Sequence, residues 1–268
     1  MPSLSDTVRG ALRLLGQRLN TDLGQHFLTD DGVLSDIISA ANVRPGVRIV
    51  EIGAGLGILT RALLATGADV TAIEIDKRWI PFLTAYVASD DGALKRLRLI
   101  QGNALEFPFP NEPYAIVANI PYHITSPLLR HAFLESPRPP ESLTLLIQRE
   151  VAERICDTED GNLLSLIVSL FGKPHQVRRV GASSFLPPPK VESAVLRIDC
   201  FATPRVDAAT LDTVLHLAKH AFGQKRKMLR GSIGKLPGGA EKLHAVGIDP
   251  ARRPQTLSTD EWIALARA

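Results

Sequence analysis

The chain has 268 residues, of which 45% are hydrophobic and 5% aromatic, and its formal net charge is +3. That length can bury a full core and suggests one large domain with a smaller one. No apolar run approaches the roughly 18 residues of a transmembrane helix, and no signal-peptide pattern opens the chain. The two cysteines lack metal or redox spacing, so we expect a cytoplasmic protein without membrane anchor, secretion signal or metal centre.

The first 20 residues are poor in acids and place Arg9, Arg13 and Arg18 among leucines. This pattern leaves three interpretations open. The segment is a frayed amphipathic helix, an arm that contacts a polyanion such as RNA, or an organellar targeting segment.

Predicted strands and helices alternate between residues 33 and 147. The run Thr29-Asp30-Asp31 is the expected N-cap of the first helix. Because short loops join the elements, the alternation predicts a parallel sheet with helices on both faces. The expected strands are 48–52, 69–75, 97–101, 114–119 and 143–147, and the expected helices are 33–41, 57–66, 78–88 and 127–135.

An antiparallel pair of strands, 176–180 with 191–198, is expected to close the sheet after helices over 148–155 and 163–171. Three consecutive prolines, Pro187–Pro189, lie between the two strands of this pair. Because proline cannot donate a ladder hydrogen bond, we expect this run to be an exposed, rigid connector.

The pattern past residue 203 is helical, with expected helices over 207–222, 225–233, 239–246 and 259–267. From Lys219 to the last residue there are ten Lys or Arg against four acids, a local net charge of +6. We therefore expect an α/β domain over residues 1–203 and a small, basic, all-α domain over 204–268. The second domain is expected to bind a polyanion.

A glycine-rich turn, Gly53–Gly57, follows the apolar strand 48–52 and precedes a helix. Glycines permit positive φ and a close approach of backbone to ligand, and the helix N-terminus offers free N–H groups. The next strand reaches Glu74 about 20 residues on, where nucleotide-binding α/β folds place the acceptor for ribose hydroxyls. The Gly-x-Gly-x-Gly spacing after an acid, Glu51, favours S-adenosylmethionine over a dinucleotide. Glu51 either contacts the ammonium group of that cofactor or holds the glycine turn by accepting backbone N–H bonds.

The run Asn119-Ile120-Pro121-Tyr122 follows an apolar strand and suits methylation of an exocyclic amine on a base. The N6 lone pair of adenine is delocalised into the ring, so the amine is a poor nucleophile until acceptors hold its hydrogens. The Asn119 amide oxygen and the Ile120 carbonyl are the expected acceptors, and the Tyr122 ring offers a face for stacking. The alternative is a strand end with a tight turn and a core tyrosine.

These motifs together resemble the KsgA/Dim1 family of ribosomal RNA adenine N6,N6-dimethyltransferases, and the resemblance covers nearly the whole chain. The matching segments are 24–28, 51–57, 72–76, 119–122, 148–154, 185–193, 221–229 and 253–258. The related Erm methyltransferases of large-subunit RNA share the first four of these segments and a version of the one that begins at Phe185, but they look less like the last two. Those last two segments favour the KsgA/Dim1 family over Erm.

The resemblance implies a Rossmann-like S-adenosylmethionine-dependent methyltransferase domain with a small C-terminal all-α domain. It implies transfer of two methyl groups to each of two adjacent adenosines near the 3′ end of small-subunit (16S-type) rRNA. The substrate would be an immature ribosomal subunit, and the enzyme would act as a monomer.

The resemblance also implies roles for individual residues. Phe185 would cover the face of an unstacked adenine opposite Tyr122. Position 103 usually carries Asp, which accepts from the cofactor adenine's amine; the Asn103 amide oxygen can accept the same bond without charge. The implied cofactor-binding residues are His26, Leu28, Gly53, Gly55, Glu74, Asn103 and Asn119, the catalytic ones are Asn119, Ile120, Tyr122 and Phe185, and the RNA-binding ones are Lys219, Lys225, Arg226, Lys227 and Arg230.

Functions of three kinds remain as alternatives. One is another enzyme activity, namely Erm-like N6 methylation of 23S rRNA or, after it, DNA adenine methylation, and another is a ribosome-assembly factor that acts mainly by binding. A third is a transcription cofactor derived from this family, which would need a processed N-terminus and affinity for duplex DNA. Methyl transfer from a sulfonium needs positioning rather than a metal or covalent nucleophile, and no paired carboxylates or Ser/His/Asp set stands out in the sequence.

Overall fold

The structure is a computed structural model that describes residues 3–16, 25–88, 92–157, 159–224 and 226–268. The chain divides into two compact units. Unit 1 comprises residues 1–152 and 175–200, and unit 2 comprises residues 153–174 and 201–268.

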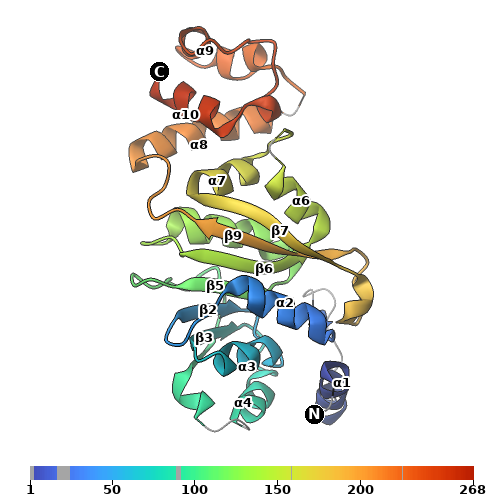
Figure 1. Cartoon of the computed structure of the whole chain (residues 1–268). Helices are drawn as coiled ribbons and strands as arrows, with labels where there is room; N and C mark the ends of the chain where they lie inside the picture. Colours follow the sequence, from blue (N-terminus) through green and yellow to red (C-terminus); the bar gives the residue numbers. More distant parts are fainter. Residues whose placement is uncertain (1–2, 17–24, 89–91, 158, 225) are drawn as a thin grey trace. The chain divides into compact units, whose positions relative to one another are not determined.

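A seven-stranded sheet forms the centre of unit 1 (Figure 1). Its strand order is β4-β3-β2-β5-β6-β9-β7; the first five strands are parallel, and β9 runs antiparallel to β6. The strands are β2 (Arg48–Ile52), β3 (Asp69–Glu74), β4 (Leu97–Gln101), β5 (Ala115–Asn119), β6 (Ser142–Gln148), β7 (Gly172–Val180) and β9 (Ser193–Cys200).

The sheet reverses its order between β2 and β5. From β2 the chain builds outward to β3 and β4, whereas β5 and β6 lie on the other side of β2. In open α/β sheets, ligands bind outside the carboxyl ends of the strands at such a reversal. β5 and β6 are buried along nearly their whole length, as expected for central strands covered on both faces. The predicted Rossmann-like α/β fold is confirmed.

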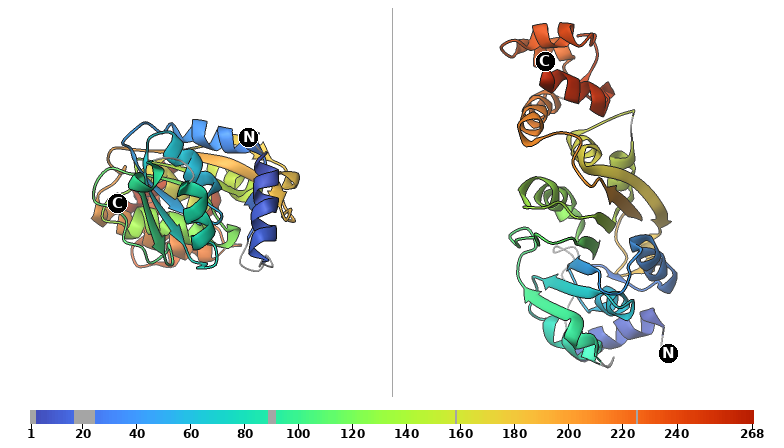
Figure 2. Two further views of the ribbon diagram at one scale, coloured as in Figure 1. Left: turned by 90° about the horizontal axis from the view of Figure 1, so that it is seen from below. Right: turned by 60° about the vertical axis from the view of Figure 1, so that its left-hand side comes forward.

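Helices cover both faces of this sheet, with α2 and α5 on opposite faces (Figure 2). Asp30, the middle residue of the predicted capping run, is the N-cap of α2, and its Oδ1 accepts a hydrogen bond from the Val33 N–H at 3.1 Å. A π-helical turn, His131–Glu135, extends α5. The helices are α1 (Leu4–Leu15), α2 (Asp31–Ala41), α3 (Ile58–Ala65), α4 (Ile80–Ala88), α5 (Thr125–Arg130) and α6 (Arg149–Cys156).

The amphipathic segment near the N-terminus forms α1. Leu4, Val8 and Ala11 are buried, and the Leu4 N–H donates to the Asp31 carboxylate at 3.3 Å. Over Leu4–Leu15 the segment is therefore a packed helix and not a frayed one. Arg18 lies outside the described residues.

A two-stranded ladder that was not predicted joins distant parts of unit 1. β1 (Phe27–Leu28) pairs antiparallel with β8 (Phe185–Leu186). The Thr29 N–H donates to the Ser184 carbonyl at 2.8 Å, which extends the ladder. The proline run after β8 was expected to be exposed throughout, but Pro189 is buried, so only part of the connector faces solvent.

Unit 2 is helical. It contains α7 (Leu163–Phe171), α8 (Ala208–Gly223), α9 (Gly239–Ala245) and α10 (Thr259–Arg267). Because α7 packs against α8 and α10, this unit includes residues 153–174. The division at residue 203 expected from the sequence differs from the observed units by this segment and by residues 201–203.

The helix expected over 225–233 does not form. Two short 3-10 turns, Leu229–Gly231 and Ile233–Lys235, occupy this stretch, and Lys225 is outside the described residues. Between the turns, Ser232 has φ −118° and ψ −91°, which no helix accommodates. Gly231 and Gly234 weaken helix formation on either side.

Candidate active site

A cavity of about 200 Å³ opens at the carboxyl ends of β2, β3 and β5. Its wall comes from these strand ends, the glycine turn, β1 and the loop after β4. The cavity therefore lies at the order reversal of the sheet. All seven cofactor-binding residues expected from the sequence line it: His26, Leu28, Gly53, Gly55, Glu74, Asn103 and Asn119.

The glycine turn adopts backbone conformations that other residues rarely adopt. Gly53 has φ 73° and Gly55 has φ 52°. A Cβ added at Gly55 would lie 3.0 Å from Phe27 Cε1, closer than ordinary packing permits. Both positions need glycine for their positive φ, and Gly55 also needs it for the close approach of Phe27 in β1.

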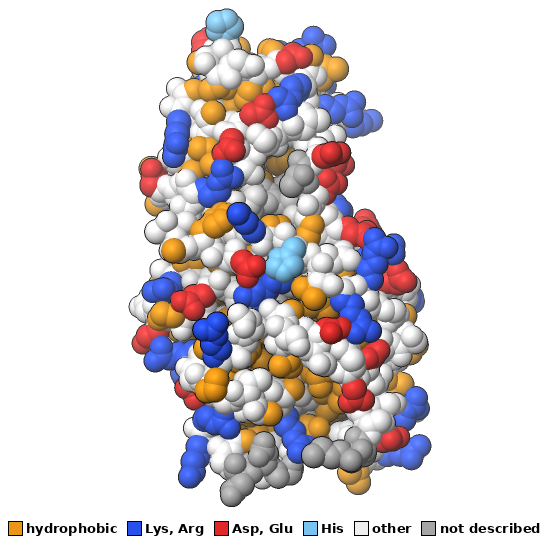
Figure 3. All heavy atoms as spheres, viewed as in Figure 1, with side chains coloured by type: hydrophobic (Ala, Val, Ile, Leu, Met, Phe, Trp, Pro, Cys, Tyr) orange, Lys and Arg blue, Asp and Glu red, His pale blue; other side chains and the backbone are white. Residues whose placement is uncertain are grey.

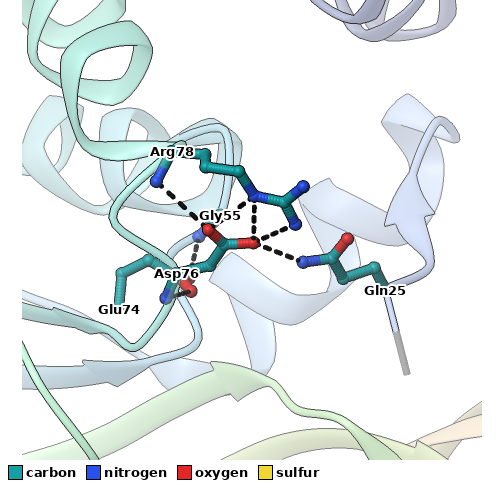
Figure 4. Close-up of polar contacts among 5 residues, drawn as sticks. All are labelled: Gln25, Gly55, Glu74, Asp76 and Arg78. Carbon is teal, nitrogen blue, oxygen red and sulfur yellow. Dashed lines mark hydrogen bonds and ion pairs between the residues drawn. The ribbon is translucent and has the colours of Figure 1, made fainter. Parts of the chain in front are cut away.

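Glu74, at the end of β3, holds the glycine turn and the next loop together (Figure 4). Its Oε2 accepts from the Gly55 N–H at 2.7 Å, and its Oε1 accepts from the Asp76 N–H at 2.8 Å. Burial raises the pKa of Glu74. Each carboxylate oxygen can accept one further hydrogen bond, so Glu74 retains acceptors for a ligand hydroxyl.

Asp76 connects the same loop to the segment before β1 (Figure 4). It accepts hydrogen bonds from the Arg78 guanidinium and from Gln25 Nε2, the latter at 3.0 Å. The bond from Arg78 lowers the pKa of Asp76 to about 2, so this carboxylate is ionised at neutral pH. Gln25 lines the cavity and is positioned by this contact.

Glu51 is a buried carboxylate in the wall of the cavity, with 1% of its surface exposed. Its Oε2 has no hydrogen-bond partner among the residues that the structure describes. Burial raises the pKa of Glu51 to about 8; the Glu74 carboxylate acts in the same direction and the nearby Thr60 acts against it. An unpartnered buried oxygen is costly unless a ligand satisfies it. This oxygen is therefore available to a cationic ligand group, which is one of the two roles expected for Glu51.

Asn119 lies at the end of β5 and lines the cavity. Its Nδ2 donates to the His26 carbonyl oxygen at 3.4 Å, and no described residue donates to its Oδ1. The next residue, Ile120, is buried, with 2% of its surface exposed, and it does not line the cavity.

Tyr122 stands beside the cavity in a 3-10 turn, between Pro121 and His123, which both line it. The side chain is half-buried and therefore not a core tyrosine. Its hydroxyl lies 2.7 Å from Ser193 Oγ, and its ring lies nearly parallel to the His26 ring, at 17° with centroids 6.2 Å apart. Burial raises the pKa of Tyr122, so the phenol is neutral at physiological pH.

His26 links β1 to the proline connector. Its Nδ1 lies 2.8 Å from the Pro187 carbonyl oxygen. Because a carbonyl can only accept, Nδ1 carries the proton in this contact. His26 thereby holds three features in place: the connector, the Asn119 amide and the Tyr122 ring.

Contrary to the expectation from the sequence, Phe185 does not lie where it could cover the face of an adenine opposite Tyr122. The side chain is 4% exposed and belongs to the hydrophobic core of unit 1, with Leu28 as its ladder partner. A ring packed in this way offers no open face to a base. The expectation that Tyr122 and Phe185 enclose the target adenine is therefore wrong for this structure, because the β1–β8 ladder turns Phe185 inward.

Several cavity residues were not predicted from the sequence, among them Ile75. It follows Glu74, lines the cavity and is 65% exposed, which is unusual for a large apolar side chain. Such a side chain suits one face of an aromatic ligand. The signal was present in the sequence as an apolar residue directly between the two carboxylates at the end of a strand.

Asn103 makes a local turn at the rim of the cavity. Its Oδ1 accepts from the Leu105 N–H at 3.0 Å, and its Nδ2 donates to Glu106 Oε1 at 2.8 Å. The amide oxygen keeps a second lone pair for a ligand amine.

Four of the expected RNA-binding residues lie on unit 2: Lys219, Arg226, Lys227 and Arg230. All four are exposed, and no acid of the described residues pairs with them. Arg205 and Arg252 of the same unit, by contrast, pair with Asp260 and Glu261. On the face of the molecule shown in Figure 3, basic and acidic side chains are interspersed.

The described ranges contain no cluster of three or more His, Cys, Asp or Glu side chains suited to hold a metal ion. Within the same ranges, no helix has the length and apolar character needed to cross a membrane.

The sheet reversal, the glycine turn and the cavity acids define the class of this protein as an S-adenosylmethionine-dependent methyltransferase with a Rossmann-like fold. The unpartnered Glu51 oxygen suits the cationic end of that cofactor, and the Glu74 oxygens suit its ribose. Comparison with known families then identifies the group. The family model for ribosomal RNA adenine dimethylase matches residues 16–268, and the chain belongs to this family.

Several curated relatives carry the name ribosomal RNA small subunit methyltransferase A. The one from Brucella abortus is 43% identical, over 92% of this chain and 91% of its own length. Those from Novosphingobium aromaticivorans and Dehalococcoides mccartyi are 40% and 37% identical, and the matches cover 91% and 97% of this chain and 91% and 92% of theirs.

Two solved structures are similar over most of the chain. A dimethyladenosine transferase from Plasmodium falciparum has a TM-score of 0.77 and 26% identity, covering 90% of this chain and 96% of its own. The 23S rRNA methyltransferase ErmE has a TM-score of 0.74 and 26% identity, covering 90% and 98%. The chain is therefore an rRNA adenine dimethyltransferase that uses S-adenosylmethionine, and the family predicted from its motifs is confirmed.

Proposed function

We propose that the enzyme dimethylates N6 of two adjacent adenosines near the 3′ end of small-subunit rRNA. It acts as a cytoplasmic monomer on an immature ribosomal subunit. The curated relatives support the small-subunit assignment, because their names specify it and the matches cover more than nine-tenths of each chain compared above. The observation that carries the chemistry is the Asn119 amide, anchored through Nδ2 at the edge of the cavity with its oxygen free.

The cavity residues would hold the cofactor by complementary chemistry. When bound, S-adenosylmethionine supplies a methyl group on a cationic sulfur that departs as a neutral thioether. Glu74 would accept from the ribose hydroxyls, Glu51 would face the ammonium group, and the Asn103 oxygen would accept from the adenine amine. Ile75 would cover one face of the adenine, and Gly53 and Gly55 would allow the backbone to approach.

The Asn-Ile-Pro-Tyr turn would hold the target base. The Asn119 oxygen and the Ile120 carbonyl accept the two N6 hydrogens, which directs the nitrogen lone pair toward the cavity. Tyr122 offers its ring for stacking, worth about 1–3 kcal/mol per base. The N6 proton is lost after the nitrogen has become cationic, so no strong general base is required.

The unpaired cations of unit 2 would bind RNA phosphates. Lys219, Arg226, Lys227 and Arg230 are exposed and have no acidic partner among the described residues, and Lys225 is proposed with them from the sequence alone. Each phosphate contact releases counterions, so binding through this cluster weakens as salt rises.

A labelling experiment tests the assignment. The purified enzyme is incubated with labelled S-adenosylmethionine and either small-subunit particles or bare large-subunit RNA, and the RNA is digested to nucleosides. We expect N6,N6-dimethyladenosine near the 3′ end of the small-subunit RNA. Label confined to large-subunit RNA would establish the Erm-like alternative, and tight particle binding without label would establish the assembly-factor alternative.

A further inference from the structure

We propose that Ser193 is a positioning residue that holds the Tyr122 ring and thereby promotes addition of the second methyl group. The inference rests on the proposed function, because it concerns the orientation of the target adenine. It assigns to Ser193 an effect on the ratio of monomethylated to dimethylated product.

Ser193 is built into the central sheet of unit 1. It is the first residue of β9, is fully buried, and pairs in register with Gln148 of β6. Its Oγ lies 2.7 Å from Tyr122 Oη. A hydroxyl on a buried strand therefore fixes the outer end of a ring that otherwise stands on a short turn.

His26 makes a second contact with the ring. The two rings are nearly parallel, within the range of offset stacking. His26 itself is held by the Pro187 carbonyl, and its own carbonyl accepts from Asn119. The Ser193 hydroxyl is thus the only hydrogen-bond partner of the Tyr122 hydroxyl among the described residues, and its removal frees the ring to rotate and tilt.

The two methyl transfers depend on this ring to different degrees. Each transfer forms an N–C bond with the N6 lone pair and breaks the C–S bond, whose electron pair stays on sulfur; N6 then releases one proton to water. Adenine brings two N6 hydrogens, which the Asn119 oxygen and the Ile120 carbonyl hold together. N6-methyladenine brings one, so a single acceptor and the stacking surface must orient it. A loosened Tyr122 should therefore impair the second transfer more than the first.

The test measures the product ratio of Ser193→Ala by nucleoside mass spectrometry on small-subunit particles. We expect the ratio of N6-methyladenosine to N6,N6-dimethyladenosine at limited turnover to rise about fivefold, the factor expected for one ordinary net hydrogen bond. Cofactor affinity measured by calorimetry should not change, because Ser193 does not line the cavity. The matched control is Ser232→Ala, which also removes a fully buried serine hydroxyl, but one that belongs to unit 2.

Tyr122→Phe tests the same bond from its other end and keeps the ring. It should raise the product ratio as Ser193→Ala does, and the double variant should be no worse than either alone. Additive effects, or a wild-type ratio in Ser193→Ala, would overturn the proposal. If Ser193→Ala does not fold, Tyr122→Phe tests the proposal by itself, and a wild-type product ratio in that variant would overturn the proposal. Failure of the proposed function would look different, because the wild-type enzyme would then form no dimethyladenosine on these particles.

Discussion

The side-chain amide of Asn119 donates a hydrogen bond to the backbone carbonyl of His26 across an N···O distance of 3.4 Å. The reverse orientation of the amide would set two acceptors against each other, so this contact decides which end faces the carbonyl. The amide oxygen is consequently turned away from His26 and is free to accept a hydrogen from a ligand amine.

Replacing Asn119 with Ala should lower the methylation rate by about 100-fold or more, the usual effect of removing one preorganised polar contact at a reacting centre. Single-turnover measurements report this rate directly. Calorimetric cofactor binding and RNA binding should persist, since other residues line most of the cavity. Asn111→Ala, an exposed asparagine, is the control. A variant that retains its rate would remove Asn119 from the chemistry.

Glu51 should make stability depend on pH. Burial raises its folded-state pKa from the ordinary 4.5 to about 8, so between these values the folded protein holds a proton that the unfolded chain releases. The free energy of unfolding should therefore fall as pH rises through this window, by up to about 1.4 kcal/mol per pH unit.

Glu51→Gln should flatten this slope, and it should be more stable than the wild type above pH 8. The raised pKa of Glu74 acts in the same direction, so part of the slope will remain. Urea denaturation at several pH values measures the effect, with the exposed Glu112→Gln as control. Parallel curves for the wild type and Glu51→Gln would show that this carboxyl is not buried in solution.

The cations of unit 2 should determine how RNA binding responds to salt. Changing Arg226, Lys227 and Arg230 together to Gln should reduce the slope of log K against log salt by about 2–3. Fluorescence anisotropy with a labelled rRNA fragment measures the slope. The matched triple change of Arg48, Lys95 and Arg98, exposed cations of unit 1, should leave it nearly unchanged. Equal effects of the two triples would mean that the cluster has no special role.

Phe185 should behave as a core residue. Phe185→Ala should lower the free energy of unfolding by about 3–5 kcal/mol, whereas Phe185→Leu should cost less than about 1.5 kcal/mol. Because the ring is 4% exposed, we expect Phe185→Leu to retain most of the methylation rate. Loss of that rate in a stable Phe185→Leu variant would show instead that the ring reaches the base during turnover.

The central sheet and the cavity residues could be predicted because their signals are local. Each parallel strand is a short apolar run, and the glycines that must take positive φ are visible as Gly53, Gly55 and Gly57. The strand that ends at Glu74 fixes the carboxylate beside this turn through the β2–β3 register. Spacing and residue type were sufficient in these cases.

The remaining features depend on long-range contacts. Two-residue strands are too short for any periodicity, so the β1–β8 ladder and the burial of Phe185 left no pattern in the sequence. The placement of α7 with unit 2 follows from the partners of its apolar surface, which periodicity does not specify. The composition of the basic stretch after α8 predicted a helix, but Gly231 and Gly234 disfavour one, and two short 3-10 turns form instead.

The β1–β8 ladder also bears on biosynthesis. Thr29 and Ser184, bonded beside the ladder, are 155 residues apart in sequence, and Leu28 in that ladder forms part of the cavity wall. A nascent chain can form the early parallel strands as they leave the exit tunnel. The part of the cavity wall that depends on the β1–β8 ladder can form only after most of the polypeptide has emerged. We therefore expect the ability to bind the methyl donor to appear late in co-translational folding, after the α/β scaffold is already in place.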